Sequence, residues 1–147
     1  MKILHTSDWH LGGKLNDLER MDEYREAIQY LIDLANSEKV DMVLIAGDVY
    51  DTFIPTSAAE NLFFESLKAF SRGGEAAVVV VAGNHDEPKR LMAANTFAKE
   101  FNIFIAGTMD PVELPEKKFN NINATSSGSG YITFTTKANE NAVVACL

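Results

Sequence analysis

Four short segments of this chain are predicted to be strands, at residues 2–7, 41–46, 76–82 and 101–106, and all but the first are apolar along most of their length. A continuously apolar strand is typical of a parallel sheet covered on both faces, whereas a strand with one wet face alternates between apolar and polar residues. The stretches between these segments have the spacing of amphipathic helices. Strands that alternate with helices predict an α/β fold with right-handed crossovers.

Three amphipathic stretches would connect these strands. Residues 18–36 place apolar side chains three and four positions apart, as one face of a helix requires. Ser57 and Glu60 have the spacing of a capping box at the start of a second helix, which we expect to end near residue 71 at a pair of glycines. Pro88 opens a third predicted helix, which runs to about residue 100.

After residue 110 the composition changes. Residues 120–130 are rich in serine, asparagine and glycine and predict a surface loop. Residues 131–136 alternate like a half-exposed strand, and residues 138–141 favour a hairpin turn. A further apolar strand begins at Asn141. Because a domain seldom ends inside such a strand, we expect residues 1–147 to be part of a larger domain, without its C-terminal part or any later domain.

The composition bounds the class of protein. With 147 residues, of which 46% are hydrophobic and 23% charged, the chain can form one globular unit with a core. No apolar run approaches the roughly 20 residues of a membrane span, and the amino terminus does not resemble a signal peptide, so we expect a soluble cytoplasmic protein. The single cysteine, Cys146, excludes an internal disulfide. The net charge of −8 argues against nucleic-acid binding through a broad basic face, although divalent cations can reverse the sign locally.

Polar side chains follow three of the predicted strands at the point where each strand ends. The clusters are Asp8-Trp9-His10, Gly47-Asp48-Val49-Tyr50-Asp51 and Gly83-Asn84-His85-Asp86. Ligands of open parallel sheets bind outside the carboxyl ends of the strands, and the glycines let the backbone turn out of the sheet there. Carboxylate, amide and imidazole groups in one place suit Mn²⁺, Fe²⁺ or Zn²⁺ better than Ca²⁺. The sequence therefore predicts a divalent-metal site at this edge of the sheet.

Each cluster also has an interpretation that involves no metal. Asp8 could cap a turn, His10 could be a surface histidine, and the carboxylates of the second cluster could simply form a turn. Asn84 could supply a left-handed backbone conformation. Asp86 is equally compatible with a carboxylate at a helix N-terminus and with a supporting position behind the metal ligands. His5, inside the first strand, is interpreted as a core histidine and is left out of the site.

The motifs D-x-H, G-D-x-x-D and G-N-H-D, in this order, resemble those of the calcineurin-like metallophosphoesterases. The fuller stretches at residues 5–12 and 46–52 resemble, more narrowly, the SbcD family of nuclease subunits from bacterial SbcCD complexes. The resemblance covers residues 1 to about 106 well. It implies the first half of an α/β/β/α sandwich, in which helices flank a parallel sheet and the second sheet is only begun.

The same resemblance implies an activity and partners. Its members are metal-dependent DNA phosphodiesterases, with double-strand exonuclease and single-strand or hairpin endonuclease activity. They act in DNA repair, recombination and replication together with an SMC-like ATPase of the SbcC type. The resemblance therefore implies that DNA and an SbcC-like ATPase are the partners of this chain.

The resemblance also assigns roles to the polar residues. Two divalent cations, expected to be Mn²⁺, would be bound by Asp8, His10, Asp48 and Asn84. Asp48 would bridge the two ions. His85 would face the scissile phosphate, and the carboxylate of Asp51 would orient it. The family pattern includes further histidines downstream, but this chain has three histidines and none follows His85, so we expect residues 1–147 to bind metal weakly and to have little activity alone.

Two other functions remain open. Another calcineurin-like phosphoesterase could act on small phosphodiesters or phosphoproteins, and a non-catalytic scaffold could keep the fold only for partner binding. A scaffold, however, has no need for Asp8, Asp48 and Asn84 together. Turnover of duplex DNA against turnover of a small phosphodiester would separate the two enzyme hypotheses.

Phe64 indicates an interface on the second predicted helix. Most apolar residues of residues 57–71 share one face, but Phe64 points well away from it. An exposed phenylalanine is typical of a contact surface. Relatives in the SbcD family dimerise through helices in this region, so we predict a homodimer contact near Phe64.

Overall fold

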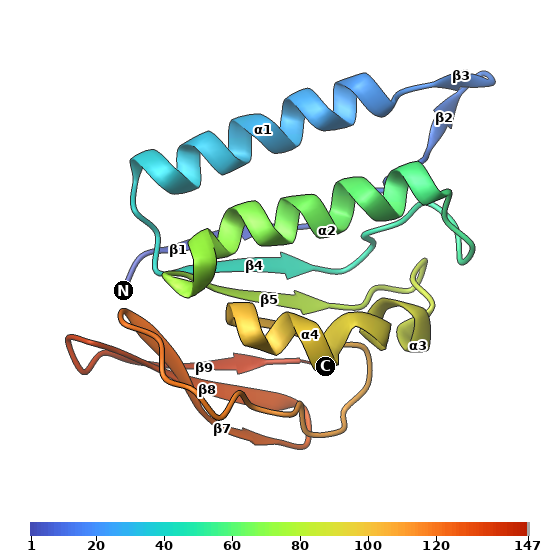
Figure 1. Cartoon of the computed structure of the whole chain (residues 1–147). Coiled ribbons are helices and arrows are strands. Elements are labelled where there is room, and N and C mark those ends of the chain that lie inside the picture. Colours follow the sequence, from blue (N-terminus) through green and yellow to red (C-terminus); the bar gives the residue numbers. More distant parts are fainter. Residues whose placement is uncertain (147) are drawn as a thin grey trace.

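The computed structural model describes residues 1–146. Its central feature is a parallel sheet formed by β1 (Ile3–Thr6), β4 (Met42–Ala46), β5 (Ala77–Val81) and β6 (Ile103–Ala106) (Figure 1). The strands lie side by side in the order β1-β4-β5-β6. The predicted α/β fold with a parallel sheet is confirmed, and all four strands end at one edge.

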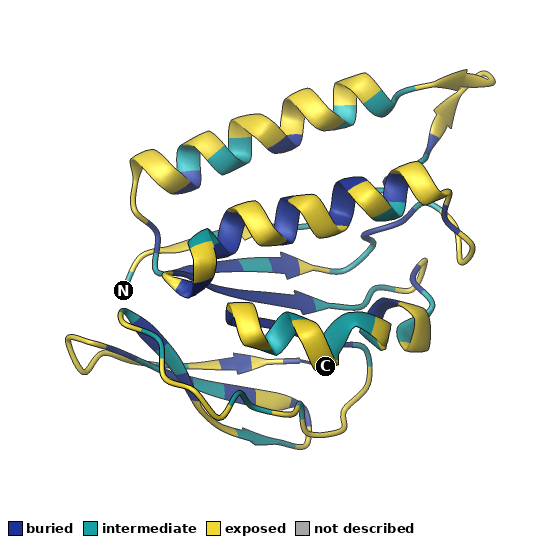
Figure 2. Ribbon diagram, viewed as in Figure 1, coloured by how far each residue is buried: buried dark blue, intermediate teal, exposed yellow. Residues whose placement is uncertain are grey.

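Helices cover one face of this sheet. α1 (Met21–Ser37) follows β1, α2 (Ser57–Ser71) follows β4, and the short α3 (Pro88–Leu91) and α4 (Asn95–Ala98) follow β5. Each crossover adds the next strand on the same side of the last one, and crossovers of one hand then place every helix on one face. The buried core under the helices (Figure 2) includes Val43, Ile45, Phe63, Phe70 and Val80.

An antiparallel sheet covers the other face. It consists of β7 (Ile122–Gly128), β8 (Tyr131–Thr136) and β9 (Asn141–Ala145), paired in that order. A second core lies between the two sheets, where the rings of Phe104 and Phe134 meet at 73° with centroids 5.5 Å apart. The chain thus forms helix, sheet and sheet layers (Figure 1), as expected for the first half of an α/β/β/α sandwich.

The prediction of a surface loop at residues 120–130 is wrong, because β7 occupies most of that stretch. Ile122 and Ala124 are buried in the second core, and the strand pairs with β8 along its length. A bulge lies between Ala124 and Ser126, and the polar residues beyond it are exposed or half-buried. β7 is the outer strand of its sheet, and a polar edge strand cannot be told from a loop by composition.

β1 is only half covered, which contradicts the prediction of a buried strand. It lies at the outer edge of the parallel sheet. The second core reaches Met42 of β4, but Ile3 stays 46% exposed and His5 is exposed. Leu4 points to the other face and packs against the helical core. His5 is therefore not a core histidine.

The helix starts differ slightly from those predicted. The chain forms a short hairpin, β2 (Lys14–Leu15) with β3 (Leu18–Glu19), before α1 begins. Asn16 and Asp17 have φ of 48° and 68°, as a tight type I′ turn requires. α2 is capped by Thr56 and not by Ser57, because Thr56 Oγ1 accepts a hydrogen bond from the Ala59 N–H at 3.2 Å.

The helix predicted at residues 88–100 is broken into α3, α4 and two 3-10 turns at residues 92–94 and 99–101. Asn95 begins α4, directly after the first of these turns. Its Nδ2 donates to the carbonyl of Ile105 at 2.7 Å, and its Oδ1 accepts from the N–H of the same residue at 3.1 Å. This side chain therefore joins the start of α4 to β6. Within residues 1–146, no helix is both long enough and apolar enough to cross a membrane.

Candidate metal centre

The loops that follow β1, β4 and β5 are held together by backbone hydrogen bonds. Asp8 N–H donates to the carbonyl of Gly47 at 3.1 Å, and His10 N–H donates to the carbonyl of Asp48 at 2.9 Å. Gly47 N–H in turn donates to the carbonyl of Val81 at 2.9 Å. The three polar clusters therefore meet at the carboxyl edge of the sheet, as its parallel topology requires.

Asp8, His10 and Asp48 form a group of potential metal ligands. One ligand atom from each lies within 4.8 Å of the others. His10 Nε2 is 3.9 Å from Asp8 Oδ1 and 3.9 Å from Asp48 Oδ2. The side chain of Asp8 is 67% exposed and that of Asp48 only 15%, so the group runs from the surface inward. Two carboxylates and an imidazole at these separations fit Mn²⁺, Fe²⁺ or Zn²⁺.

The backbone of all three residues is left-handed. Asp8, His10 and Asp48 have φ of 56°, 45° and 50°. Residues other than glycine rarely adopt this region, at a cost of about 1–3 kcal/mol each, and such residues cluster at functional sites. The surrounding hydrogen bonds must hold them there. Six other non-glycine residues also have a positive φ, at turns and helix ends, so this backbone conformation is compatible with a site but does not by itself establish one.

Two glycines allow the second and third loops to approach closely. A Cβ atom on Gly83 would lie 2.2 Å from both the backbone nitrogen and Oδ1 of Asp48. Gly47 has φ of 84°, and its Cβ would lie 3.2 Å from Gly83 Cα. The sequence predicted that these glycines let the chain turn. For Gly83, the structural reason is the contact with Asp48.

His85 is oriented by the backbone of Asp51, which differs from the predicted contact. Its Nδ1 lies 3.1 Å from the carbonyl oxygen of Asp51. A carbonyl only accepts, so Nδ1 carries the proton and Nε2 is the free nitrogen. The carboxylate of Asp51 lies elsewhere, with Oδ1 3.7 Å from His10 Nδ1. A carboxylate behind a ligand histidine is a common support in metal sites, which the sequence did not assign to Asp51.

Asn84 lies where two pockets meet. One, of about 370 Å³, is also lined by Asp48, Gly83 and Ala145 of β9. The other, of about 270 Å³, is also lined by Asp51 and His85. Asn84 is thus close to the potential ligands and to the free histidine. The apolar Ala145 gave no signal in the sequence that it would contribute to this place.

Trp9 anchors the first loop to the helical core. It is buried, with its ring 6.4 Å from that of Phe63 and 6.2 Å from that of Phe70 in α2. Its indole N–H donates to Thr6 Oγ1 at 3.0 Å. Because Trp9 points into the core, the residues on either side of it face the carboxyl edge of the sheet.

Tyr50 stays out of the acid–base chemistry of the site. Its pKa is raised, first by burial and then by the negative charges of Glu60 and Asp86, while Arg90 acts in the opposite direction. The phenol therefore remains neutral at physiological pH. Its ring packs edge to face on Phe63 at 5.5 Å, so Tyr50 anchors the second loop to α2.

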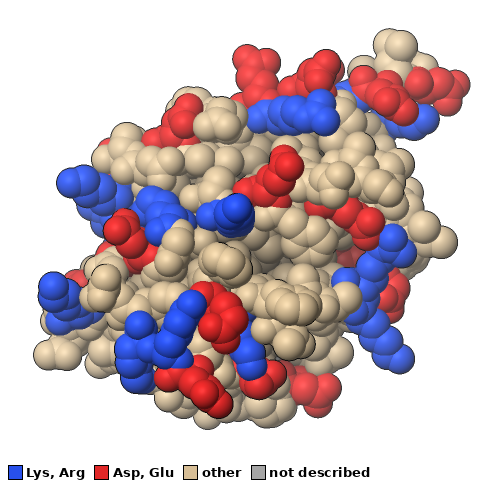
Figure 3. All heavy atoms as spheres, viewed as in Figure 1, with Lys and Arg blue, Asp and Glu red and all other residues tan. Residues whose placement is uncertain are grey.

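The charges of the surface are mixed. Figure 3 shows Lys and Arg interspersed with Asp and Glu over the face in view, without one broad patch of either sign there. The net charge of the chain is −8. The face in view therefore offers no broad basic surface for a polyanion.

Comparison with known proteins identifies the family. The model of the calcineurin-like phosphoesterase family matches residues 1–141. The chain belongs to that family. It is 42% identical over 116 residues to the D subunit of the nuclease SbcCD from Bacillus subtilis, a match that covers 78% of this chain and 30% of that relative.

Other relatives carry the same description. Identity is 36% over 110 residues to the D subunit of the nuclease SbcCD from Rhodobacter capsulatus, which covers 74% of this chain and 27% of that relative. Identity is 41% over 86 residues to the D subunit of the nuclease SbcCD from Escherichia coli K12, a match that covers 58% of this chain and 21% of that relative. The chain thus spans less than a third of the length of these relatives. The resemblance to the N-terminal part of SbcD is confirmed.

Proposed function

We propose that this chain is the metal-binding half of a DNA phosphodiesterase domain. The observation that carries the proposal is the group of Asp8, His10 and Asp48, held in left-handed loops at one edge of the sheet. It occurs in a chain whose relatives are described as nuclease subunits. Asp8 and His10 would bind a first cation, Asp48 would bridge it to a second, and Asn84 would bind the second.

Mn²⁺ is the metal that we propose for both positions. Divalent cations at such a site generate hydroxide near neutral pH and neutralise charge on phosphoryl oxygens. The chain itself supplies the groups that hold and orient the reactants. His85 Nε2 is free and close to Asn84, so a protonated His85 can donate a proton to the leaving oxygen of the phosphodiester. The hydrogen bond from Nδ1 to the Asp51 carbonyl holds the ring in place, and Nδ1 keeps its proton after Nε2 has donated.

DNA is the substrate that we propose, with an SbcC-like ATPase as partner. Both are suggested by the relatives, which are described as subunits of the nuclease SbcCD. The activities would be exonuclease on duplex ends and endonuclease on single strands or hairpins, in cytoplasmic DNA repair, recombination and replication. The negative net charge is compatible with this because metal ions would reverse the potential where the phosphate binds.

A second copy of the chain is a further proposed partner. Phe64 of α2 is 39% exposed, and it lines an apolar pocket of about 180 Å³ together with Phe97 and Phe101. These two rings are 76% and 45% exposed. Three phenylalanines around one apolar hollow favour a buried contact, so we propose that the homodimer forms through α2 and the segment around α4.

The ligand set of residues 1–147 is incomplete under this proposal. The sequence contains no histidine after His85, and the resemblance calls for further histidine ligands. We therefore propose that these residues alone bind Mn²⁺ weakly and cleave DNA poorly.

The test expresses the full reading frame that encodes this chain. Mn²⁺-dependent cleavage of end-labelled duplex DNA is compared with hydrolysis of a small aryl phosphodiester. We expect DNA to be the better substrate and Asp48→Asn to abolish its cleavage, while exposed Asp22→Asn leaves it intact. Preferential hydrolysis of the small phosphodiester would favour another phosphoesterase of the family. Absent turnover of both substrates would favour the scaffold, and metal-independent turnover would contradict the proposed metal site.

A further inference from the structure

Asp86 is a buried carboxylate that joins two loops of the site. It is only 2% exposed. Its Oδ1 accepts a hydrogen bond from the N–H of Tyr50 at 3.0 Å, and its Oδ2 accepts from the N–H groups of Val49 at 3.1 Å and Gly83 at 2.8 Å. One side chain therefore binds backbone groups on both the second and the third loop.

These contacts exclude the two simplest roles for Asp86. It is not the cap of the following helix, because Glu87 is the N-cap of α3 and accepts from the N–H of Arg90 at 2.6 Å. It is not free to bind a cation, because both oxygens are buried and already accept backbone hydrogen bonds. A carboxylate with three backbone donors is a firm structural connection, since hydrogen bonds to an ionised group are the stronger kind.

The connected positions flank the proposed ligands. Val49 directly follows Asp48, and Gly83 directly precedes Asn84. A second hydrogen bond joins the same two loops, in which the N–H of His85 donates to Asp48 Oδ1 at 3.0 Å. The left-handed backbone of Asp48 turns the next two N–H groups away from the ladder of β4, and Asp86 supplies the acceptor that buried donors need.

We propose that Asp86 is a positioning residue, which holds Asp48 in register with Asn84 and His85 without touching metal or substrate. The significance for metal binding rests on the proposed function, but the connection of the loops does not. Removal of the carboxylate should let the second loop relax from its left-handed conformation. The distance between Asp48 and Asn84, the proposed ligands of the second cation, would then no longer be fixed.

The first test measures Mn²⁺ binding by the product of the full reading frame, using equilibrium titration and the electron paramagnetic resonance spectrum of the bound ion. Asp86→Asn keeps the side-chain volume, but it replaces one acceptor oxygen with an NH₂ group, which cannot accept a hydrogen bond from the backbone N–H groups. We expect it to weaken Mn²⁺ binding about 10–100-fold and to change the spectrum, as loss of groups that orient ligands does. The control, Asn95→Ala, removes two hydrogen bonds to β6 outside the site and should leave Mn²⁺ affinity unchanged.

The second test needs neither a variant nor a metal. In the unsubstituted protein, the amides of Val49, Tyr50 and Gly83 should exchange with solvent as slowly as those of β4, although they lie in loops. Fast exchange of these amides would overturn the proposal, as would a folded Asp86→Asn protein with wild-type Mn²⁺ affinity. Slow exchange in a protein that binds no Mn²⁺ would keep the loop connection and reject the proposed function instead.

Discussion

The imidazole rings of His10 and His85 meet edge to face, with centroids 5.1 Å apart and planes at 88°. Their nitrogen atoms nevertheless have different surroundings. His10 Nε2 faces the carboxylates of Asp8 and Asp48, and His85 Nδ1 is bound to the carbonyl of Asp51. These surroundings are consistent with the roles proposed above, metal binding for His10 and proton donation for His85.

Substitution should separate these two tasks. In the product of the full reading frame, we expect His10→Gln to weaken Mn²⁺ binding, because a proposed ligand is lost. His85→Gln should leave Mn²⁺ affinity unchanged and slow single-turnover DNA cleavage by about 10²–10⁴-fold, the range for loss of a general acid. Titration of Mn²⁺ alongside single-turnover kinetics checks both. Loss of Mn²⁺ affinity in His85→Gln would contradict the division of roles.

A methyl group on Gly83 should disrupt the site. Gly83→Ala places a Cβ within 2.2 Å of backbone and side chain of Asp48, so the two loops must move apart. We expect loss of Mn²⁺ binding and a lower free energy of unfolding in urea. The control is Gly73→Ala, whose Cβ meets no atom within 4 Å and which bears only the strain of φ 69°, about 1 kcal/mol. Equal behaviour of the two variants would mean that the close approach does not matter.

The phenylalanine pocket should govern the oligomeric state. Phe64→Glu or Phe97→Glu would place a charge in an apolar contact, so each should convert a dimer to a monomer in sedimentation velocity at micromolar concentration. Tyr30→Glu, at an exposed position of α1, is the matched control and should remain dimeric. A monomeric unsubstituted protein would contradict the proposed homodimer.

Asp41 should make part of the stability depend on acid pH. Its carboxylate accepts hydrogen bonds from the Lys2 N–H at 2.7 Å and from Asn121 Nδ2 at 2.8 Å, and so connects both sheets. Burial acts to raise its pKa, but these hydrogen bonds and the charges of the amino terminus and Arg72 together lower it. A group with a lowered pKa stabilises the fold above its unfolded value, about 4, and this contribution is lost as the pH falls through the folded value.

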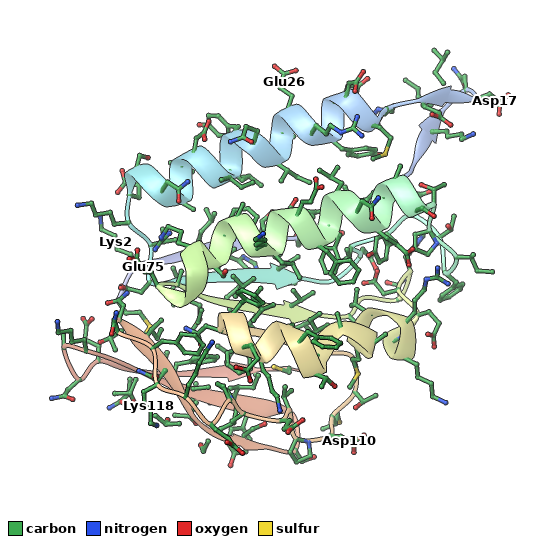
Figure 4. All side chains as sticks on the ribbon, in the orientation of Figure 1. Lys2, Asp17, Glu26, Glu75, Asp110 and Lys118 are labelled. Carbon is green, nitrogen blue, oxygen red and sulfur yellow. The ribbon has the colours of Figure 1, made fainter. Side chains whose placement is uncertain are left out.

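Asp41→Asn should therefore be less stable than the parent at pH 7 and lose less stability below about pH 4. Urea unfolding between pH 7 and pH 2.5 measures this difference. The control is Asp17→Asn, at the tip of the β2–β3 hairpin and at the opposite end of the molecule from Lys2 (Figure 4). Parallel stability curves for Asp41→Asn and the parent would contradict the assignment.

The differences between prediction and structure have a common physical origin. β7 has the composition of a loop because it has only two apolar residues, Ile122 and Ala124. The rest of the strand is polar or glycine and is exposed or half-buried. β1 was predicted to be a buried strand, but it lies at a sheet edge. The helix predicted at residues 88–100 is broken next to Asn95, whose side chain bonds to Ile105. In each case the position in the fold or a distant partner overrides a local pattern.

The sequence by itself determined the parallel sheet, the alternation of its strands with helices, and the types of residue at the strand ends. These depend on periodicity, on glycine and on the chemistry of side chains, which are local properties. Only the tertiary structure decided that the Asp51 carboxylate stands behind His10 while its carbonyl orients His85. It also decided that Asp86 connects the second loop to the third. Such contacts join residues that are distant in the sequence, and they follow from how the loops pack.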